Sequence, residues 1–314
     1  MVDHPKKIVF RDSTLREGLD TPGVSFSADQ KLRIARVLDE ADIPEVEIIA
    51  PSRVLQDLEF ARSVRNEIPR LVTSGLIYSY SSRARVEIKA ASEFLHRFDL
   101  LMPVSERREP FERSAKVALL REILAFALSH HSEVGVGFPH SMQTDLPFLL
   151  EISQCAAREG AKRLTIYDTN GSANPFSVHA LVERLRSGTD VAVFFHGHND
   201  LGLATANALA AIRAGADGVD VTVNGLGDRA GNASLEQVAL ALHLGRFPTG
   251  VKLRSLKKMS ELIEKESGVS VSKLAPVVGE FILHHKSPSH LKDPDLFEAF
   301  DPQILAIERK IDKP

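Results

Sequence analysis

Residues 191–202 read VAVFFHGHNDLG, and this stretch decides the fold class. Its first five residues form an apolar run that is long enough for one buried strand and too short for a helix. The run leads into His196-Gly197-His198, and residues two apart in a strand point to the same face. Both imidazoles therefore face one point, where two neutral nitrogens can bind one metal ion. The alternative is a pair of solvated loop histidines.

Apolar runs of this kind alternate with helical patterns along most of the chain. One helix is expected to begin at a capping box formed by Ser27 and Gln30. Strands that are apolar rather than alternating predict a parallel sheet, and eight strand–helix units predict a (β/α)8 TIM barrel. A doubly wound open sheet is the alternative, but no glycine-rich phosphate loop follows the first strand. The strands are expected at residues 8–10, 46–49, 71–77, 98–102, 133–138, 164–167, 191–195 and 218–223.

The length of 314 residues allows one large domain and a smaller appendage. We expect a catalytic barrel over residues 1–250. The composition changes afterwards, and residues 251–314 are expected to form a small C-terminal helical subdomain that acts as a lid over a barrel mouth. The barrel it covers is its own or that of a partner subunit.

Composition also restricts the class of protein. A net charge of −3 argues against nucleic acid as the main partner. No apolar run approaches the ~20 residues of a membrane-spanning helix, and the N-terminus shows no signal peptide. The single cysteine, Cys155, excludes an intramolecular disulfide. We therefore expect a cytoplasmic protein with no membrane partner.

Arg11 and Asp12 end the first strand, which lies beside strand eight in a closed barrel and two strands from the histidine pair. Asp12 is therefore expected to share a site with His196 and His198. One carboxylate and two imidazoles suit Mg²⁺, Mn²⁺ or Zn²⁺ with positions left open for a substrate. A structural ion pair between Arg11 and Asp12 is the alternative.

Three segments together resemble motifs of the DRE-TIM metallolyase superfamily: residues 11–18 (RDSTLREG), 196–202 (HGHNDLG) and 225–232 (GLGDRAGN). They are similar in particular to its Claisen-condensing branch, the homocitrate and isopropylmalate synthases. The resemblance implies Asp12, His196 and His198 as metal ligands, with Asn232 as a weaker fourth. It also implies that Arg11 polarises the substrate carbonyl.

The resemblance implies a metal-dependent condensation of acetyl-CoA with a 2-oxo acid in amino-acid biosynthesis, which releases CoA. Residues 283–290 resemble a family segment that would make His290 an acid/base residue supplied across a homodimer. Glu47 is a candidate base, with an ion pair as the alternative. Thr169 and Asn170, after the sixth strand, are expected to bind the substrate.

Residues 135–143 of the fifth strand lack the carboxylates and arginine of the family pattern, so a long dicarboxylate should not bind in the usual way. A replacement clamp is conceivable from surface arginines. These are Arg83, Arg85, Arg107 and Arg108.

Two other functions stay open. A 3-hydroxy-3-methylglutaryl-CoA lyase-like or aldolase-type enzyme would cleave a C–C bond on the same metal, but the loop after strand eight lacks the cysteine usual in that lyase. A non-catalytic barrel is the third possibility, and metal ligands kept at three strand ends argue against it.

Overall fold

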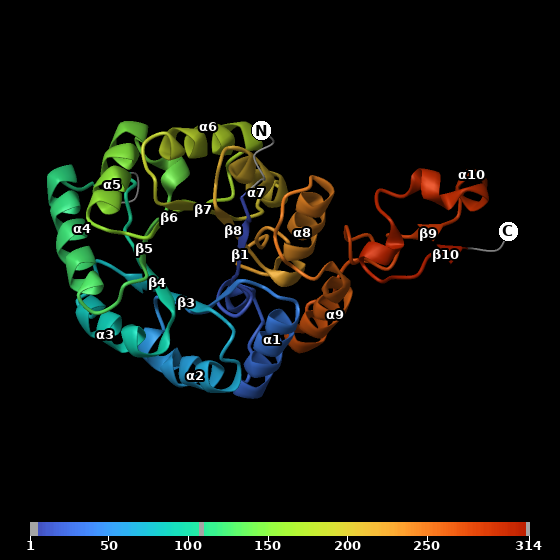
Figure 1. Ribbon diagram of the computed structural model, residues 1–314, viewed down its shortest axis with the longest axis horizontal. Coiled ribbons are helices and arrows are strands. Elements are labelled where there is room, and N and C mark those ends of the chain that lie inside the picture. The colour runs from blue at the N-terminus through green and yellow to red at the C-terminus, as the bar shows by residue number, and fades with distance from the viewer. Residues whose placement is uncertain (1–5, 107–109, 312–314) are drawn as a thin grey trace.

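The computed structural model describes residues 6–106 and 110–311. Eight parallel strands pair in chain order, and β1 also pairs with β8, which closes the sheet into a barrel. The closing register sets Arg11 opposite Asp220. The predicted TIM barrel is therefore confirmed (Figure 1). The strands are β1 (Val9–Asp12), β2 (Glu45–Ile49), β3 (Thr73–Tyr78), β4 (Arg97–Leu101), β5 (Val134–Phe138), β6 (Arg163–Asp168), β7 (Ala192–Gly197) and β8 (Gly218–Val221).

Helices follow the strands and form the outer ring of the barrel (Figure 1). The first begins at the expected capping box, in which the side chains of Ser27 and Gln30 each accept from the other's backbone N–H. Strand β8 ends two residues earlier than expected, because residues 223–225 form a 3₁₀ turn in which Asn224 has a φ of 58°. The helices are α1 (Ala28–Glu40), α2 (Val54–Glu67), α3 (Ala84–Phe94), α4 (Arg113–Leu128), α5 (Leu146–Arg158), α6 (Pro175–Arg186), α7 (Ala204–Arg213) and α8 (Leu235–Leu244).

The barrel interior holds a layer of buried, paired charges. The guanidinium of Arg11 donates to both carboxylate oxygens of Asp220 at 2.7 Å and to Asp99 at 2.6 Å. Arg163 donates to the other oxygen of Asp99 and to Glu45, each at 2.7 Å. A buried charge is costly unless it is paired and hydrogen-bonded, so these alternating signs stabilise one another across β1, β2, β4, β6 and β8.

Strand β5 makes room for neighbouring side chains because glycine occupies two of its positions. A Cβ atom added at Gly135 would lie 2.0 Å from Oδ1 of Asp99. One added at Gly137 would lie 2.9 Å from both Cδ2 of Leu101 and Cε2 of Tyr167. Side chains from β4 and β6 therefore occupy the space that side chains of β5 would need.

The chain after residue 250 forms one more helix on the barrel and then an arm. Helix α9 (Leu256–Ser267) packs against α1 and the turn after β8. Residues 269–311, here called the arm, first pack on the barrel, where Val277, Phe300 and Leu305 join its hydrophobic core, and the part with α10 (Pro288–Lys292) extends away from it (Figure 1). The arm also contains a parallel pair of short strands, β9 (His284–His285) and β10 (Lys310–Ile311). The expected helical structure is thus found in α9, whereas the arm is mainly irregular. The domain boundary at residue 250 stays a prediction.

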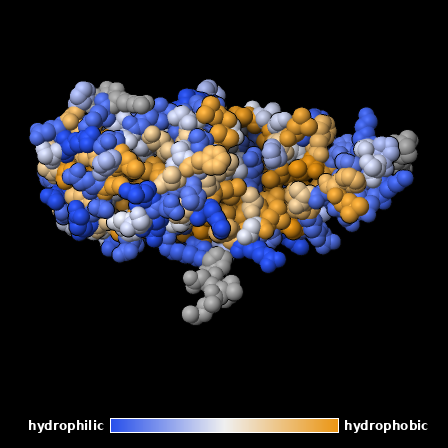
Figure 2. Space-filling model, turned by 90° about the horizontal axis from the view of Figure 1, so that it is seen from above, coloured by the Kyte–Doolittle hydropathy of each residue, from blue (hydrophilic) through white to orange (hydrophobic). Residues whose placement is uncertain are grey.

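Apolar side chains are exposed on the arm. Leu274 and Leu296 are 80% and 75% exposed, and Phe297 is 47% exposed. Figure 2 shows hydrophobic surface around the place where the arm leaves the barrel. None of the helices in the described part of the chain is long and apolar enough to cross a membrane.

Candidate metal centre and substrate cavity

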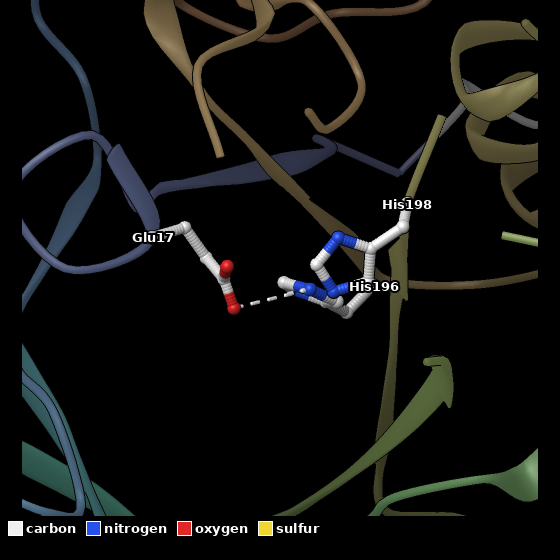
Figure 3. Close-up of side chains that lie close together, drawn as sticks. All are labelled: Glu17, His196 and His198. Atoms are coloured by element: carbon white, nitrogen blue, oxygen red, sulfur yellow. Dashed lines mark ion pairs between the residues drawn. The ribbon is translucent and has the colours of Figure 1, made fainter. Parts of the chain in front are cut away.

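Three buried side chains converge at the carboxyl ends of the barrel strands: Glu17, His196 and His198. One ligand atom from each lies within 4.8 Å of the others. The histidines come from the end of β7, and Glu17 comes from the 3₁₀ turn Glu17–Asp20 that follows β1. Figure 3 shows the carboxylate of Glu17 directed at the imidazole of His196, with Oε1 at 3.6 Å from Nε2. The expected convergence of the two histidines is therefore present.

Among the buried polar atoms that have no hydrogen-bond partner within the described residues, four belong to candidate ligand groups. They are Nε2 of His196, Nδ1 of His198, Oε2 of Glu17 and Oδ1 of Asn232. Asn232 is brought to the site by an antiparallel bridge between its backbone and that of His198. Leaving a buried acceptor unpaired costs about 1–3 kcal/mol, and these are nitrogen and oxygen ligands of the kind that divalent metals bind. The residues therefore fit a divalent metal ion.

The pKa values of the two histidines also suit metal binding. Burial lowers the pKa of His198 to about 3 and also lowers the pKa of His196. Both rings are therefore neutral at pH 7, which metal binding requires. Nδ1 of His196 lies 2.9 Å from Oδ2 of Asp220. Burial would raise the pKa of Asp220, but the nearby Arg11 outweighs this effect and lowers the pKa. Because the carboxylate accepts, Nδ1 carries the proton and Nε2 is free to bind the metal.

Asp12 is not part of the three-residue cluster, contrary to the expectation from sequence. Its two carboxylate oxygens accept from the backbone N–H and the hydroxyl of Thr14, both at 2.9 Å. Burial raises the pKa of Asp12 to about 7. The turn after β1 brings Glu17 to the histidines instead, because the N–H groups of Arg16 and Glu17 both donate to the carbonyl of Ser13.

Arg11 and Glu47 also occupy places other than those expected. Arg11 is completely buried in the charge layer and does not line the cavity. Glu47 accepts from Nε of Arg16 at 2.6 Å and from the hydroxyl of Ser13 at 2.9 Å, so the ion-pair alternative describes its position. Arg16, which pairs with both Glu17 and Glu47, is the arginine that faces the cavity.

A cavity of about 350 Å³ opens beside the candidate ligands. The ligand side carries charged groups, whereas β3, β4 and β6 contribute apolar and aromatic ones. Thr169 lines the cavity as expected, but Asn170 is exposed and lies outside it, with Oδ1 at 3.2 Å from Nδ1 of His140. The lining residues are Arg16, Glu17, Asp20, Ala50, Pro51, Ser52, Leu76, Tyr78, Tyr80, Leu101, Pro103, Pro139, His140, Tyr167, Thr169, His196 and His198.

Within the described part of the chain, the surface arginines do not form the clamp for a substrate carboxylate that was considered from the sequence. Arg83 pairs with Glu87 and Arg85 with Glu122, and neither arginine lines the cavity. Arg107 and Arg108 lie outside the described residues.

His290 lies on α10 in the arm, and no described residue after position 198 lines the cavity of the same chain. Its ring stacks on Phe297 with 3.9 Å between centroids, and its Nδ1 lies 3.4 Å from Nδ1 of His285. His285 in turn contacts Glu298 at 2.9 Å. The arm therefore holds His290 in a defined place, away from its own barrel mouth.

Sequence reasoning missed Glu17, Asp220 and Tyr167. Glu17 lies inside the segment 11–18 that carries the resemblance, but the same segment also contains Arg11-Asp12, to which the sequence reasoning assigns the metal ligand. Asp220 is the one charged residue in the apolar run 218–223, which is a signal for a buried functional carboxylate. Tyr167 gave no signal, because an aromatic residue in a strand is ordinary.

A closed (β/α)8 barrel with convergent ligand side chains at the carboxyl ends of its strands defines the class of α/β-barrel enzymes. The chain belongs to the HMGL-like family, whose model matches residues 7–263. This membership confirms the resemblance noted from the three motifs.

Relatives extend over nearly the whole chain. The 2-isopropylmalate synthase 2 of Caldanaerobacter subterraneus subsp. tengcongensis is 34% identical over 98% of this chain and 82% of its own length. Homocitrate synthase 1 of Nostoc sp. is 34% identical over 97% of this chain and 82% of its own length. Hydroxymethylglutaryl-CoA lyase from Pseudomonas aeruginosa has a similar fold, with a TM-score of 0.71 and 20% identity over 85% of this chain and 95% of that one.

Proposed function

We propose that this protein catalyses a Claisen condensation in which acetyl-CoA is added to a 2-oxo acid and CoA is released. One observation carries the proposal: a chain 34% identical to curated synthases keeps unpartnered ligand atoms at the mouth of its barrel. The same fold also supports C–C cleavage in similar structures, so the direction of the reaction is the point that the experiment must test.

The metal site in this proposal consists of Glu17, His196 and His198, with Asn232 as a fourth ligand. A divalent ion such as Mg²⁺, Mn²⁺ or Zn²⁺ supplies Lewis acidity to the ketone of the 2-oxo acid. Asp220 orients His196, and the guanidinium of Arg16, rather than that of Arg11, stabilises negative charge that develops on the substrate.

The cavity supports a 2-oxo acid without a second carboxylate. Arg16 is the one arginine or lysine that lines it within the described residues, and its charge is paired with Glu17 and Glu47. On the side of β3, β4 and β6 the lining is apolar or aromatic, with Leu76 and Leu101 buried there. A second carboxylate would lose its water there without gaining a cation, which is unfavourable.

We also propose that the arm completes the site of a second subunit. His290 cannot serve its own cavity from its place on α10, and apolar side chains on the arm lie exposed in the single chain. A homodimer would cover this apolar surface and bring His290 to the partner's barrel as the acid/base residue.

The experiment is to measure the release of free thiol from acetyl-CoA with Mn²⁺ or Mg²⁺. The acids to supply are glyoxylate, pyruvate, 2-oxoisovalerate, oxaloacetate and 2-oxoglutarate. We expect metal-dependent release with an acid of apolar side chain. His196→Ala should abolish release, whereas His243→Ala, at an exposed position of α8, should leave it unchanged. If a protein that binds Mn²⁺ releases no thiol with any of these acids, the proposed condensation is overturned, and the next assay should measure C–C cleavage.

A further inference from the structure

Tyr167 lies between the candidate metal ligands and strands β4 and β5. Its ring centroid is 4.8 Å from that of His196. It shares one face of β6 with Thr165 and Arg163, whose side chains belong to the charge layer inside the barrel. Tyr167 is the last of the three toward the carboxyl end of the strand. It therefore separates the cavity from the buried charges.

A small apolar cluster forms the floor of the cavity at this point. Leu76, Leu101 and Tyr167 pack together with Tyr78, apart from the main hydrophobic core. All four side chains line the cavity. A substrate side chain that points away from the metal ligands and into the barrel therefore meets these four residues first.

The ring of Tyr167 leaves no further depth on the side of β5. A Cβ atom at Gly137 would lie 2.9 Å from Cε2 and 3.3 Å from the hydroxyl oxygen of Tyr167, so the ring contacts the backbone of that strand. The sequence lacks charged side chains on β5, and the ring occupies the space beside Gly137. A long substrate side chain has no route past it.

We propose that Tyr167 is the residue that restricts this enzyme to 2-oxo acids with a short apolar side chain, of the size of glyoxylate or pyruvate. The inference rests on the proposed function. It adds a limit on the length of the substrate side chain to the earlier proposal that the substrate has no second carboxylate. The aromatic ring sets the limit by occupying space, and the hydroxyl has no hydrogen-bond partner among the described residues.

The test is a chain-length profile. kcat/KM is measured for glyoxylate, pyruvate, 2-oxobutyrate, 2-oxoisovalerate and 2-oxoisocaproate with the wild type, Tyr167→Ala, Tyr167→Leu and Tyr167→Phe. The first two variants shorten the side chain by different amounts, and the third removes only the hydroxyl. Phe176→Ala is the matched control, because this aromatic residue is 85% exposed on the outer helix α6.

The wild type should prefer the shortest acids. Tyr167→Ala and Tyr167→Leu should raise kcat/KM for 2-oxoisocaproate relative to pyruvate by about ten-fold or more, since one methylene in an apolar pocket is worth about 10–200-fold. Tyr167→Phe and Phe176→Ala should keep the wild-type order. An unchanged order in both Tyr167→Ala and Tyr167→Leu would overturn the proposal.

Calorimetric binding of the same acids in the presence of Mn²⁺ separates this proposal from the proposed function. If the wild type releases no CoA with any acid, the condensation fails while the role of Tyr167 is still decided. The limit on side-chain length is supported if the affinity for 2-oxoisocaproate relative to that for pyruvate is higher in Tyr167→Ala than in the wild type. A ratio equal to that of the wild type overturns it.

Discussion

Nδ1 of His196 lies 2.9 Å from Oδ2 of Asp220, and the same carboxylate accepts two hydrogen bonds from Arg11. Asp220 thus joins the candidate metal centre to the charge layer inside the barrel. It holds the imidazole in the tautomer that presents Nε2 to a metal ion. We therefore propose that the buried Arg11 acts on the site through this carboxylate and not by contact with a substrate.

Asp220→Asn should weaken metal binding while the ligands stay in place. Loss of a hydrogen-bonded carboxylate behind a metal-bound histidine typically costs about 10–100-fold in affinity. Mn²⁺ affinity measured by calorimetry is the readout, with circular dichroism to confirm folding. Asp190→Asn, at an exposed position, is the control. An affinity equal to that of the wild type would show that Asp220 does not orient His196.

Glu17→Gln should lower Mn²⁺ affinity by at least about ten-fold, because the substitution removes the charged ligand of the cluster. Asp12→Asn should have the smaller effect, since both oxygens of Asp12 are already engaged by Thr14. Calorimetric titration of both variants checks the order. The reverse order would restore Asp12 as the metal ligand.

Arg16→Gln and Arg11→Gln should fail in different ways. Arg16 lines the cavity, and loss of a donor to developing charge typically costs about 10²–10³ in kcat. Arg11 is buried among carboxylates, and breaking a buried ion pair costs about 3–5 kcal/mol of stability. Arg16 is itself buried and paired with Glu17 and Glu47, so Arg16→Gln should lower both kcat and stability, whereas Arg11→Gln should act mainly by unfolding at lower urea concentration. Normal kcat in Arg16→Gln would remove Arg16 from the mechanism.

The charge layer predicts a loss of stability in acid. Burial by itself would raise the pKa of Asp99 and Glu45, but Arg163 and Arg11 outweigh it and lower both values. A pKa lower in the folded state than in the unfolded state means that stability is present above about pH 4 and is lost as the pH falls through the folded pKa.

Urea unfolding between pH 7 and pH 3 measures this dependence. Arg163→Met removes the cation shared by Asp99 and Glu45, so its loss of stability should begin at higher pH than in the wild type. Parallel profiles of the two proteins would mean that these carboxylates do not contribute to acid unfolding.

The barrel could be predicted from sequence because short apolar runs alternate with segments of helical periodicity, and four of these helices, α1, α5, α6 and α8, also begin at a capping side chain. The pair His196 and His198 could be predicted because alternation along one strand fixes both directions. Asn232 was implied by the resemblance, and the structure brings it to His198.

The carboxylate ligand could not be predicted in the same way. The segment 11–18 contains two Arg-acid pairs, Arg11-Asp12 and Arg16-Glu17, five residues apart. Which pair faces the histidines depends on the turn around Ser13 rather than on the local pattern. In the function that we propose, the roles expected for Arg11 and Asp12 therefore belong to Arg16 and Glu17.

The close approach of Gly137 and Tyr167 has an evolutionary consequence. Two strands compete for one volume, so a large side chain at either position requires a small one at the other. Position 137 is then free to acquire a side chain only after position 167 has become small. Homologous chains should therefore show these two positions varying together, and paired exchange between them is a route by which this barrel can change its substrate in two steps.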